Sequence, residues 1–164
     1  MLPIECGQIV SAPSIVAFTV QALALTSSHI VLEIGTGSGY QAAVMSHLAA
    51  QVETLDRFVT LTDLANRRFE ALKLTNVKVR QADGLSKFRQ NGPYDRIVVN
   101  AAVEEIPDAW LQQLKPGGIL VAPVGKARQV QALIKFQKTE SVLTAETLMM
   151  VRTVMLQPGI AKKL

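Results

Sequence analysis

Apolar positions along the chain fall into short runs of strand length that alternate with longer stretches of helical spacing. Runs rich in Val, Ile and Leu predict buried strands at 29–34, 52–56, 77–81, 94–100 and 119–124. Apolar residues at helical spacing predict helices between them at 13–25, 40–50, 61–74 and 107–114. Ser11 is a candidate N-cap of the first helix, and Pro107 suits the first turn of the last one.

The C-terminal part of the chain follows a different pattern. A turn is predicted at 115–118, and beyond the strand at 119–124 two further strands are predicted at about 129–137 and 147–156 with no obvious helix between them. This order indicates an α/β fold, a doubly wound, mostly parallel seven-stranded sheet with an antiparallel C-terminal edge. With 164 residues and no linker, the chain is expected to form one domain, 1–164.

The composition indicates an aliphatic core and no membrane span. Hydrophobic residues make up 49% of the chain and aromatic residues only 5%, which suits parallel strands covered by helices. The longest apolar stretch, 15–25, is about half of the ~20 residues that cross a bilayer. The first residues show no basic region before an apolar run, and the single cysteine excludes an internal disulfide and gives no metal cluster. These features predict a cytoplasmic protein.

The net charge of +4 raises the question of a nucleic-acid partner. The basic residues are scattered along the chain, whereas nucleic-acid-binding proteins usually concentrate them on one helix or stripe. A nucleic-acid partner is therefore not expected. The two histidines, His29 and His47, fall at a strand start and within a helix, and we interpret both as structural.

A glycine-rich turn follows the first predicted strand, and ligands of doubly wound sheets bind beyond the carboxyl ends of the strands. The dinucleotide fingerprint is G-x-G-x-x-G/A, whereas here Gly35, Gly37 and Gly39 alternate with other residues, Thr36 among them, after Glu33. S-adenosylmethionine carries no phosphate, and it needs close backbone approach together with acceptors for an ammonium group and hydroxyls. The loop therefore predicts S-adenosylmethionine, and Glu33 is expected to orient its amino-acid end, directly or through water.

Two more acids end the next predicted strands. Asp56 lies 21 residues past Gly35, where a carboxylate can accept hydrogen bonds from both ribose hydroxyls. Asp83 can accept from the adenine amino group, and Gly84 leaves space for the ring. The remaining candidate cofactor residues are Arg57, which follows Asp56, and Asn100, which ends the fourth strand.

Six stretches of the chain carry motifs of a known family. They are LPIECGQIVSAP at 2–13, VLEIGTGSGYQAA at 31–43, ADG at 82–84, YDRIVVNAA at 94–102 followed by IP at 106–107, and QLKPGG at 113–118. The second is nearly word for word the first motif of the protein-L-isoaspartate O-methyltransferases, and the stretch at 2–13 resembles their Gly-Gln-Thr-Ile-Ser-x-Pro segment. The resemblance covers essentially the whole chain and implies a Rossmann-like class I methyltransferase.

The resemblance also implies a reaction. Members of the family methylate the free α-carboxylate of isoaspartyl residues in damaged proteins, which leaves S-adenosylhomocysteine, and the ester then collapses through a succinimide. Ser11 matches the family's active-site serine, and Gln8, Val10 and Pro13 belong to the same substrate-side segment. Because a carboxylate is ionised near neutral pH, attack on the methyl group requires no general base, and rate enhancement is expected from positioning and desolvation.

The chain departs from the family pattern in three places. Several tens of residues that normally precede the segment at 2–13 are missing, the threonine after Gly-Gln is Ile9, and the threonine that often follows the fourth strand is Asn100. Two alternatives stay open, a methyltransferase acting on RNA or a small molecule, and a cofactor-binding module without turnover. Self-association that covers apolar surface left by the missing region would make the protein a homo-oligomer.

Overall fold

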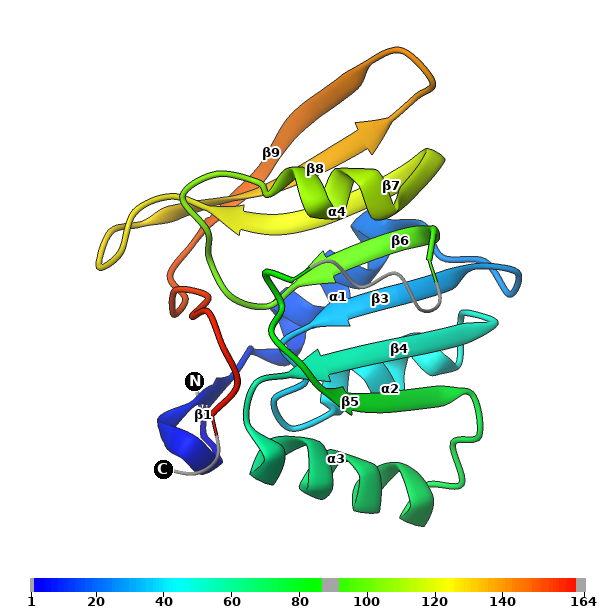
Figure 1. Cartoon of the computed structure of the whole chain (residues 1–164), viewed down its shortest axis with the longest axis vertical. Coiled ribbons are helices and arrows are strands. Elements are labelled where there is room, and N and C mark those ends of the chain that lie inside the picture. The colour runs from blue at the N-terminus through cyan, green and yellow to red at the C-terminus, as the bar shows by residue number, and fades with distance from the viewer. Residues whose placement is uncertain (1, 87–91, 162–164) are drawn as a thin grey trace.

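The computed structural model describes residues 2–86 and 92–161, and its centre is a seven-stranded sheet (Figure 1). The strands of this sheet are β3 (Ile30–Ile34), β4 (Gln51–Asp56), β5 (Val77–Gln81), β6 (Tyr94–Val99), β7 (Leu114–Val124), β8 (Gln131–Lys138) and β9 (Leu143–Val151). The α-helices are α1 (Pro13–Leu23), α2 (Tyr40–Ser46), α3 (Val59–Ala71) and α4 (Asp108–Gln113), and a short 3-10 helix, η1, spans Glu5–Gly7. Neighbouring strands pair in parallel from β5 to β7, and β8 and β9 add an antiparallel edge. The predicted fold class is confirmed.

The strand order places a crevice at the carboxyl end of β3. In the order β5-β4-β3-β6-β7-β8-β9, the chain builds outward from β3 through β4 to β5 and then resumes on the other side of β3 with β6. Connections that leave a central strand in opposite directions open a crevice between them, which is the usual ligand site of such sheets. The glycine-rich turn follows β3 at this point.

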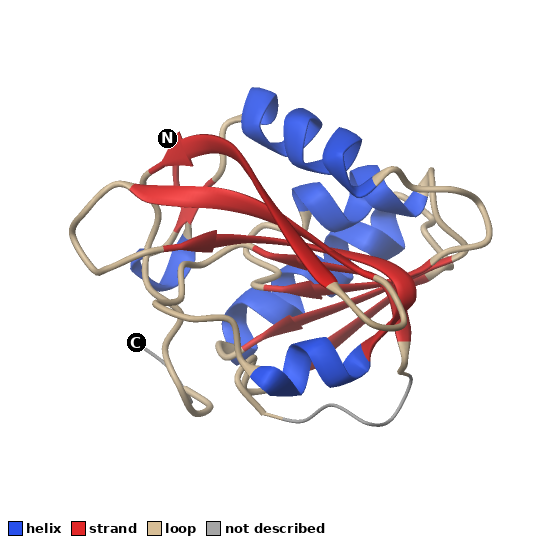
Figure 2. Cartoon of the chain, turned by 90° about the horizontal axis from the view of Figure 1, so that it is seen from above, coloured by secondary structure: helices blue, strands red, loops and turns tan. Residues whose placement is uncertain are grey.

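Two apolar cores cover the two faces of the sheet, and Figure 2 shows the layers from above. On one face α1, α2 and α3 pack through side chains such as Val20, Met45 and Phe69. On the other face α4 packs through Trp110, and Tyr94 is fully buried in the same cluster. Because both faces are covered, the central strands carry continuous apolar runs, which is why the sequence pattern could locate them.

Some predicted boundaries differ from the structure. The N-cap of α1 is Ala12 and no side chain caps this helix, so the prediction of Ser11 as N-cap is wrong. Pro13 occupies the first turn, where its missing N–H leaves less to cap. The helix predicted at 40–50 ends at Ser46, and the strand predicted at 147–156 is β9, which begins at Leu143 and ends at Val151.

The predicted turn at 115–118 lies inside β7 as an insertion. Tyr94 of β6 pairs with Leu114, and Arg96 pairs with Ile119, so residues 115–118 bulge from the ladder opposite a single residue. The sequence pattern also missed a small hairpin at the N-terminal end, β1 (Leu2–Pro3) paired antiparallel with β2 (Ile9–Val10). Its strands are too short to show an alternation of apolar and polar residues.

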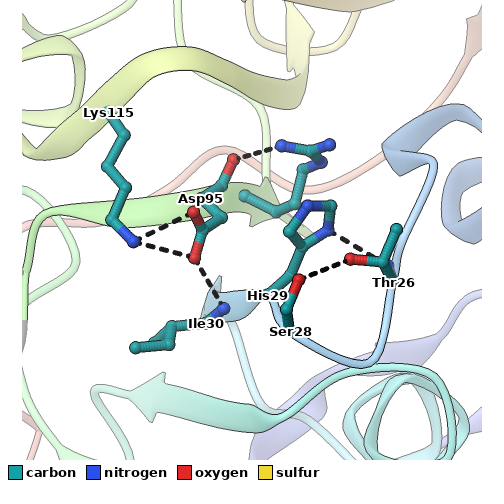
Figure 3. Close-up of polar contacts among 7 residues, drawn as sticks. Thr26, Ser28, His29, Ile30, Asp95 and Lys115 are labelled. Carbon is teal, nitrogen blue, oxygen red and sulfur yellow. Dashed lines mark hydrogen bonds and ion pairs between the residues drawn. The ribbon is translucent and has the colours of Figure 1, made fainter.

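Asp95 joins the amino-terminal ends of three strands in a polar cluster (Figure 3). Its Oδ2 accepts from the backbone N–H of Ile30 at 2.8 Å, and Nζ of Lys115 donates to both carboxylate oxygens at 2.9 and 3.0 Å. Burial raises the pKa of Asp95, but the Ile30 N–H and the Lys115 ammonium together lower it below its ordinary value. His29 lies beside this cluster, where its Nδ1 accepts from the N–H of Thr26, in agreement with a structural role.

Replacing Asp95 by Asn is expected to lower the free energy of unfolding by about 1–2 kcal/mol near neutral pH. Because the folded pKa lies below the unfolded one, this stability is present above about pH 4 and is lost as the pH falls through the folded pKa. Urea denaturation of both proteins at neutral and acidic pH measures the effect. The control Lys115→Gln should cost less, because Ile30 keeps its acceptor. A difference between D95N and the parent that stays constant down to acidic pH would contradict the assignment.

A C-terminal segment, residues 152–161, leaves β9 and runs back across the carboxyl ends of the parallel strands (Figure 1). It hydrogen-bonds with Ala102 after β6, which donates to Val154 O at 2.8 Å and accepts from the N–H of Leu156 at 2.7 Å. Farther along, the N–H of Ala161 donates to the carbonyl of Arg57 at 3.0 Å. The segment therefore borders the crevice identified from the topology.

Candidate cofactor site

The glycine loop owes its shape to residues with a positive φ. Gly35 and Gly39 have φ values of 97° and 83°, in the region that favours glycine. A Cβ at Gly39 would lie 2.8 Å from the ring of Phe69, so this position has no room for a side chain. The backbone N–H groups of Gly35 and Thr36 donate to Leu55 O at 2.8 and 3.0 Å, which ties the loop to the end of β4.

Asp56 holds the same loop from the end of β4. Its Oδ2 accepts from the N–H of Gly37 at 3.0 Å, and its Oδ1 accepts from the N–H of Phe58 at 3.1 Å. Burial raises the pKa of this carboxyl, and the backbone N–H groups oppose the rise. A carboxylate offers about four lone-pair sites, so Asp56, which lines the cleft described below, keeps acceptor capacity for two hydroxyls.

Glu33 lies beneath the loop with no exposed surface. Its Oε2 accepts from the hydroxyl of Thr54 at 2.6 Å, and its Oε1 accepts from Nδ2 of Asn100 at 3.0 Å. Burial raises the pKa of Glu33 from 4.5 to about 7, although the hydrogen bonds from Thr54 and Asn100 lower it. Glu33 does not line the cleft, so the structure places it as a support of the loop, one layer below the position that the sequence suggested.

The two predicted residues after β5, Asp83 and Gly84, have different places: Asp83 is structural, and Gly84 lines the cleft. Both oxygens of Asp83 accept backbone N–H groups at 2.9 Å, from Leu85 and from Gly159 of the C-terminal segment. Gly84 lines the cleft, and a Cβ there would lie 2.4 Å from Cγ2 of Ile34. Arg57 also lines the cleft, and its Nε donates to the carbonyl of Gly159 at 3.1 Å.

One cleft of about 760 Å³ joins these residues to the substrate-side segment. Gln8, Val10 and Ser11 line it together with the glycine loop, whereas Pro13, the first residue of α1, does not. The volume lies in the range of small-molecule sites. The predicted residues that line it are Gln8, Val10, Ser11, Gly35, Thr36, Gly37, Asp56, Arg57, Gly84 and Asn100.

The far wall of this cleft was not predicted from the sequence. Residues 150–157 line it, as do Phe58 and Gln41. Phe58 directly follows Asp56 and Arg57, so its position after a strand end was a usable signal. The contribution of 150–157 depends on the C-terminal segment turning back over the sheet, and no local pattern indicates that turn.

The residues present fit S-adenosylmethionine. The backbone of Gly35 and Gly37 on the cleft wall, the Asp56 carboxylate at the end of β4 and an apolar wall beside Gly84 supply close approach, hydroxyl acceptors and space for a ring. Within 2–86 and 92–161, no group of three or more acidic, cysteine or histidine side chains could hold a metal ion, and no helix has the length and hydropathy to cross a membrane.

Fold and cleft together define a class I methyltransferase that uses S-adenosylmethionine. A family model described as protein-L-isoaspartate(D-aspartate) O-methyltransferase matches residues 1–160. The chain belongs to that family.

Similar proteins agree with this assignment. An Azorhizobium caulinodans protein named protein-L-isoaspartate O-methyltransferase is 54% identical over 160 residues, which cover 98% of this chain and 74% of that protein. A Xanthobacter autotrophicus protein of the same name is 50% identical over 163 residues, covering 99% of this chain and 74% of that protein. These relatives are longer than the chain, as expected from the family resemblance, in which further residues precede the segment at 2–13.

Solved structures share the fold. A protein-L-isoaspartate O-methyltransferase superimposes with a TM-score of 0.84 at 31% identity, and the match covers 92% of this chain and 49% of that one, so the chain spans about half of its length. A Plasmodium falciparum structure in complex with S-adenosyl-L-homocysteine has a TM-score of 0.78 at 22% identity, covering 95% of this chain and 79% of that one.

Proposed function

We propose that the protein transfers a methyl group from S-adenosylmethionine to the α-carboxylate of isoaspartyl residues in damaged proteins. The observation that carries the proposal is that the glycine loop and Ser11 line the same cleft. Membership of the family supports the choice of acceptor. When bound, the cofactor supplies an electrophilic methyl group.

The proposed roles follow from where each side chain lies. Asp56 accepts from hydroxyls of the cofactor, and Gly84 leaves room for its ring. Ser11 is partly exposed on the cleft wall and makes no hydrogen bond with the described residues, so its hydroxyl is available to a substrate carboxylate. A carboxylate attacks as its ordinary ionised form, and the chain's contribution is to orient it and exclude water.

A matched peptide pair tests the acceptor. Two peptides that differ only in an aspartyl or isoaspartyl linkage are incubated with the protein and labelled S-adenosylmethionine, and label is expected on the isoaspartyl peptide alone. Equal labelling of both peptides would assign a less selective methyltransferase. Labelling of neither, with S-adenosylhomocysteine binding intact by calorimetry, would leave a cofactor-binding module without turnover.

Replacing Ser11 by Ala is expected to lower kcat/KM for the isoaspartyl peptide by about tenfold, the loss of one hydrogen bond to a charged group. The affinity for S-adenosylhomocysteine should stay unchanged, because Ser11 belongs to the substrate-side wall. Ser14→Ala is the matched control, since Ser14 is exposed on the first turn of α1 and outside the cleft. Equal turnover of S11A and S14A would remove Ser11 from the site.

A further inference from the structure

A chain of buried hydrogen bonds runs beneath the glycine loop. Glu33 of β3 and Thr54 of β4 are direct partners in the parallel pair, so their side chains lie on the same face. The Thr54 hydroxyl lies 2.6 Å from Oε2 of Glu33 and 2.7 Å from the hydroxyl of Thr36, the second residue of the loop. Thr36 and Thr54 are both buried.

The number of available protons determines which group donates in each of these hydrogen bonds. A hydroxyl has one proton to donate, and an ionised carboxylate only accepts. When Glu33 is ionised, Thr54 must therefore donate to Glu33, and Thr36 must donate to Thr54. The only proton of the Thr36 hydroxyl is then used inward, so Thr36, which lines the cleft, offers the cleft an acceptor and no donor.

The other carboxylate oxygen of Glu33 is held from the opposite side. Nδ2 of Asn100, which follows β6, donates to Oε1 of Glu33 and to the carbonyl of Gly35, both at 3.0 Å. Oδ1 of Asn100 in turn accepts from Nε2 of Gln41 at 3.0 Å. A threonine at this position could donate only one hydrogen bond, so the asparagine lets a single side chain hold both the carboxylate and the loop carbonyl.

We propose that Thr54, which does not line the cleft, is a positioning residue for S-adenosylmethionine: its hydroxyl relays a hydrogen bond from Thr36 to Glu33 and so fixes both the place of the glycine loop and the acceptor character of Thr36. This inference rests on the cofactor binding proposed above and is independent of the acceptor. It accounts for a buried acid that has no contact with the cleft. The cofactor carries an ammonium group, which donates hydrogen bonds and needs acceptors around it.

Calorimetry with S-adenosylhomocysteine tests the relay without any methyl acceptor. Thr54→Val keeps the shape but removes the hydroxyl that hydrogen-bonds Oε2 of Glu33 and the hydroxyl of Thr36, while Asn100 still holds Oε1, and the Kd is expected to rise about tenfold. Thr54→Ser keeps the hydroxyl and should bind within about twofold of the parent protein. The KM for S-adenosylmethionine should rise in T54V while the KM for the isoaspartyl peptide stays the same.

Two controls separate positioning from general loss of structure. Thr62 of α3 is buried and does not line the cleft, and its hydroxyl donates to the carbonyl of Val59 at 2.8 Å, so Thr62→Val removes a comparable hydrogen bond outside the relay and should leave the Kd unchanged. A cycle of Thr36→Val, Thr54→Val and the double variant should be non-additive, since the two hydroxyls act as one pair. Additive effects, or a T54S protein as weak as T54V, would overturn the relay. If T54V does not fold, T36V and T54S decide: the former must lose affinity and the latter must keep it.

Discussion

Glu33→Gln is expected to raise the free energy of unfolding by about 3 kcal/mol at pH near 8. Burial raises the pKa of Glu33 from 4.5 to about 7, so keeping this group ionised in the folded protein costs stability. Glutamine has the same shape. Its oxygen can accept from Asn100, and its amide can donate to Thr54, so the network stays satisfied without a buried charge.

The raised pKa of Glu33 determines how the stability gain of E33Q changes with pH. Because the folded pKa of Glu33 is above the unfolded one, the folded state holds the proton more tightly, and the parent protein loses stability as the pH rises from about 4.5 to about 7. The gain from E33Q should therefore be small at pH near 5 and fully developed at pH near 8. Urea denaturation at the two values measures it. Glu146→Gln, which neutralises an exposed carboxylate on β9, is the control and should change little. A gain of equal size at both values would refute the assignment to this carboxyl.

The same substitution should weaken cofactor binding. A glutamine amide that donates to Thr54 reverses the relay, so Thr54 donates to Thr36, and the Thr36 proton turns toward the cleft. An ammonium group would then meet a donor instead of an acceptor. Calorimetry should show a Kd for S-adenosylhomocysteine about tenfold higher in E33Q than in the parent protein. A more stable protein that binds its cofactor less well is a trade of the kind found at functional sites.

The second large effect is expected from Gly84→Ala. A Cβ at this position would lie 2.4 Å from Cγ2 of Ile34, the last residue of β3, so the loop after β5 must move away from the sheet. The carbonyl of Gly84 also accepts from Nε1 of Trp110 at 2.8 Å inside the core, and that bond opposes the movement. Overpacking of this kind costs about 2–3 kcal/mol of unfolding free energy. Cofactor affinity should fall as well, because Gly84 lines the cleft.

A second substitution tests whether the cost of Gly84→Ala comes from the contact between the added Cβ and Cγ2 of Ile34. Ile34→Ala removes Cγ2, and although it leaves a cavity of its own, it should cost less in the Gly84→Ala background than in the parent protein. Urea denaturation of the four proteins measures the coupling. Costs that simply add would show that the alanine is accommodated without touching Ile34.

The sheet and the glycine loop could be predicted because their signals are local. Covered strands produce continuous apolar runs, and a loop that needs a positive φ at Gly35 and Gly39 shows its glycines in the sequence. The positions of Asp56 and Gly84 follow from the rule that ligands gather at strand ends. For these elements, the local sequence pattern is sufficient.

The relay could not be predicted in this way. Thr54 is an ordinary residue within a strand, and its importance comes from the register that sets it opposite Glu33. Asp83 sits at a strand end like Asp56, yet one of its oxygens accepts from Gly159, 76 residues away. Such partners are decided by how distant segments meet, which leaves no periodic trace in the sequence.

The C-terminal segment has a consequence for the order in which the protein is completed during synthesis. Residues 152–161 emerge from the ribosome after every strand of the sheet, yet they close the wall beside Gly84 and hold Arg57 and Asp83 through Gly159. A nascent chain can therefore form the glycine loop long before it has a finished cleft. The wall of the cleft is complete only when residues 152–161 have folded back over the sheet.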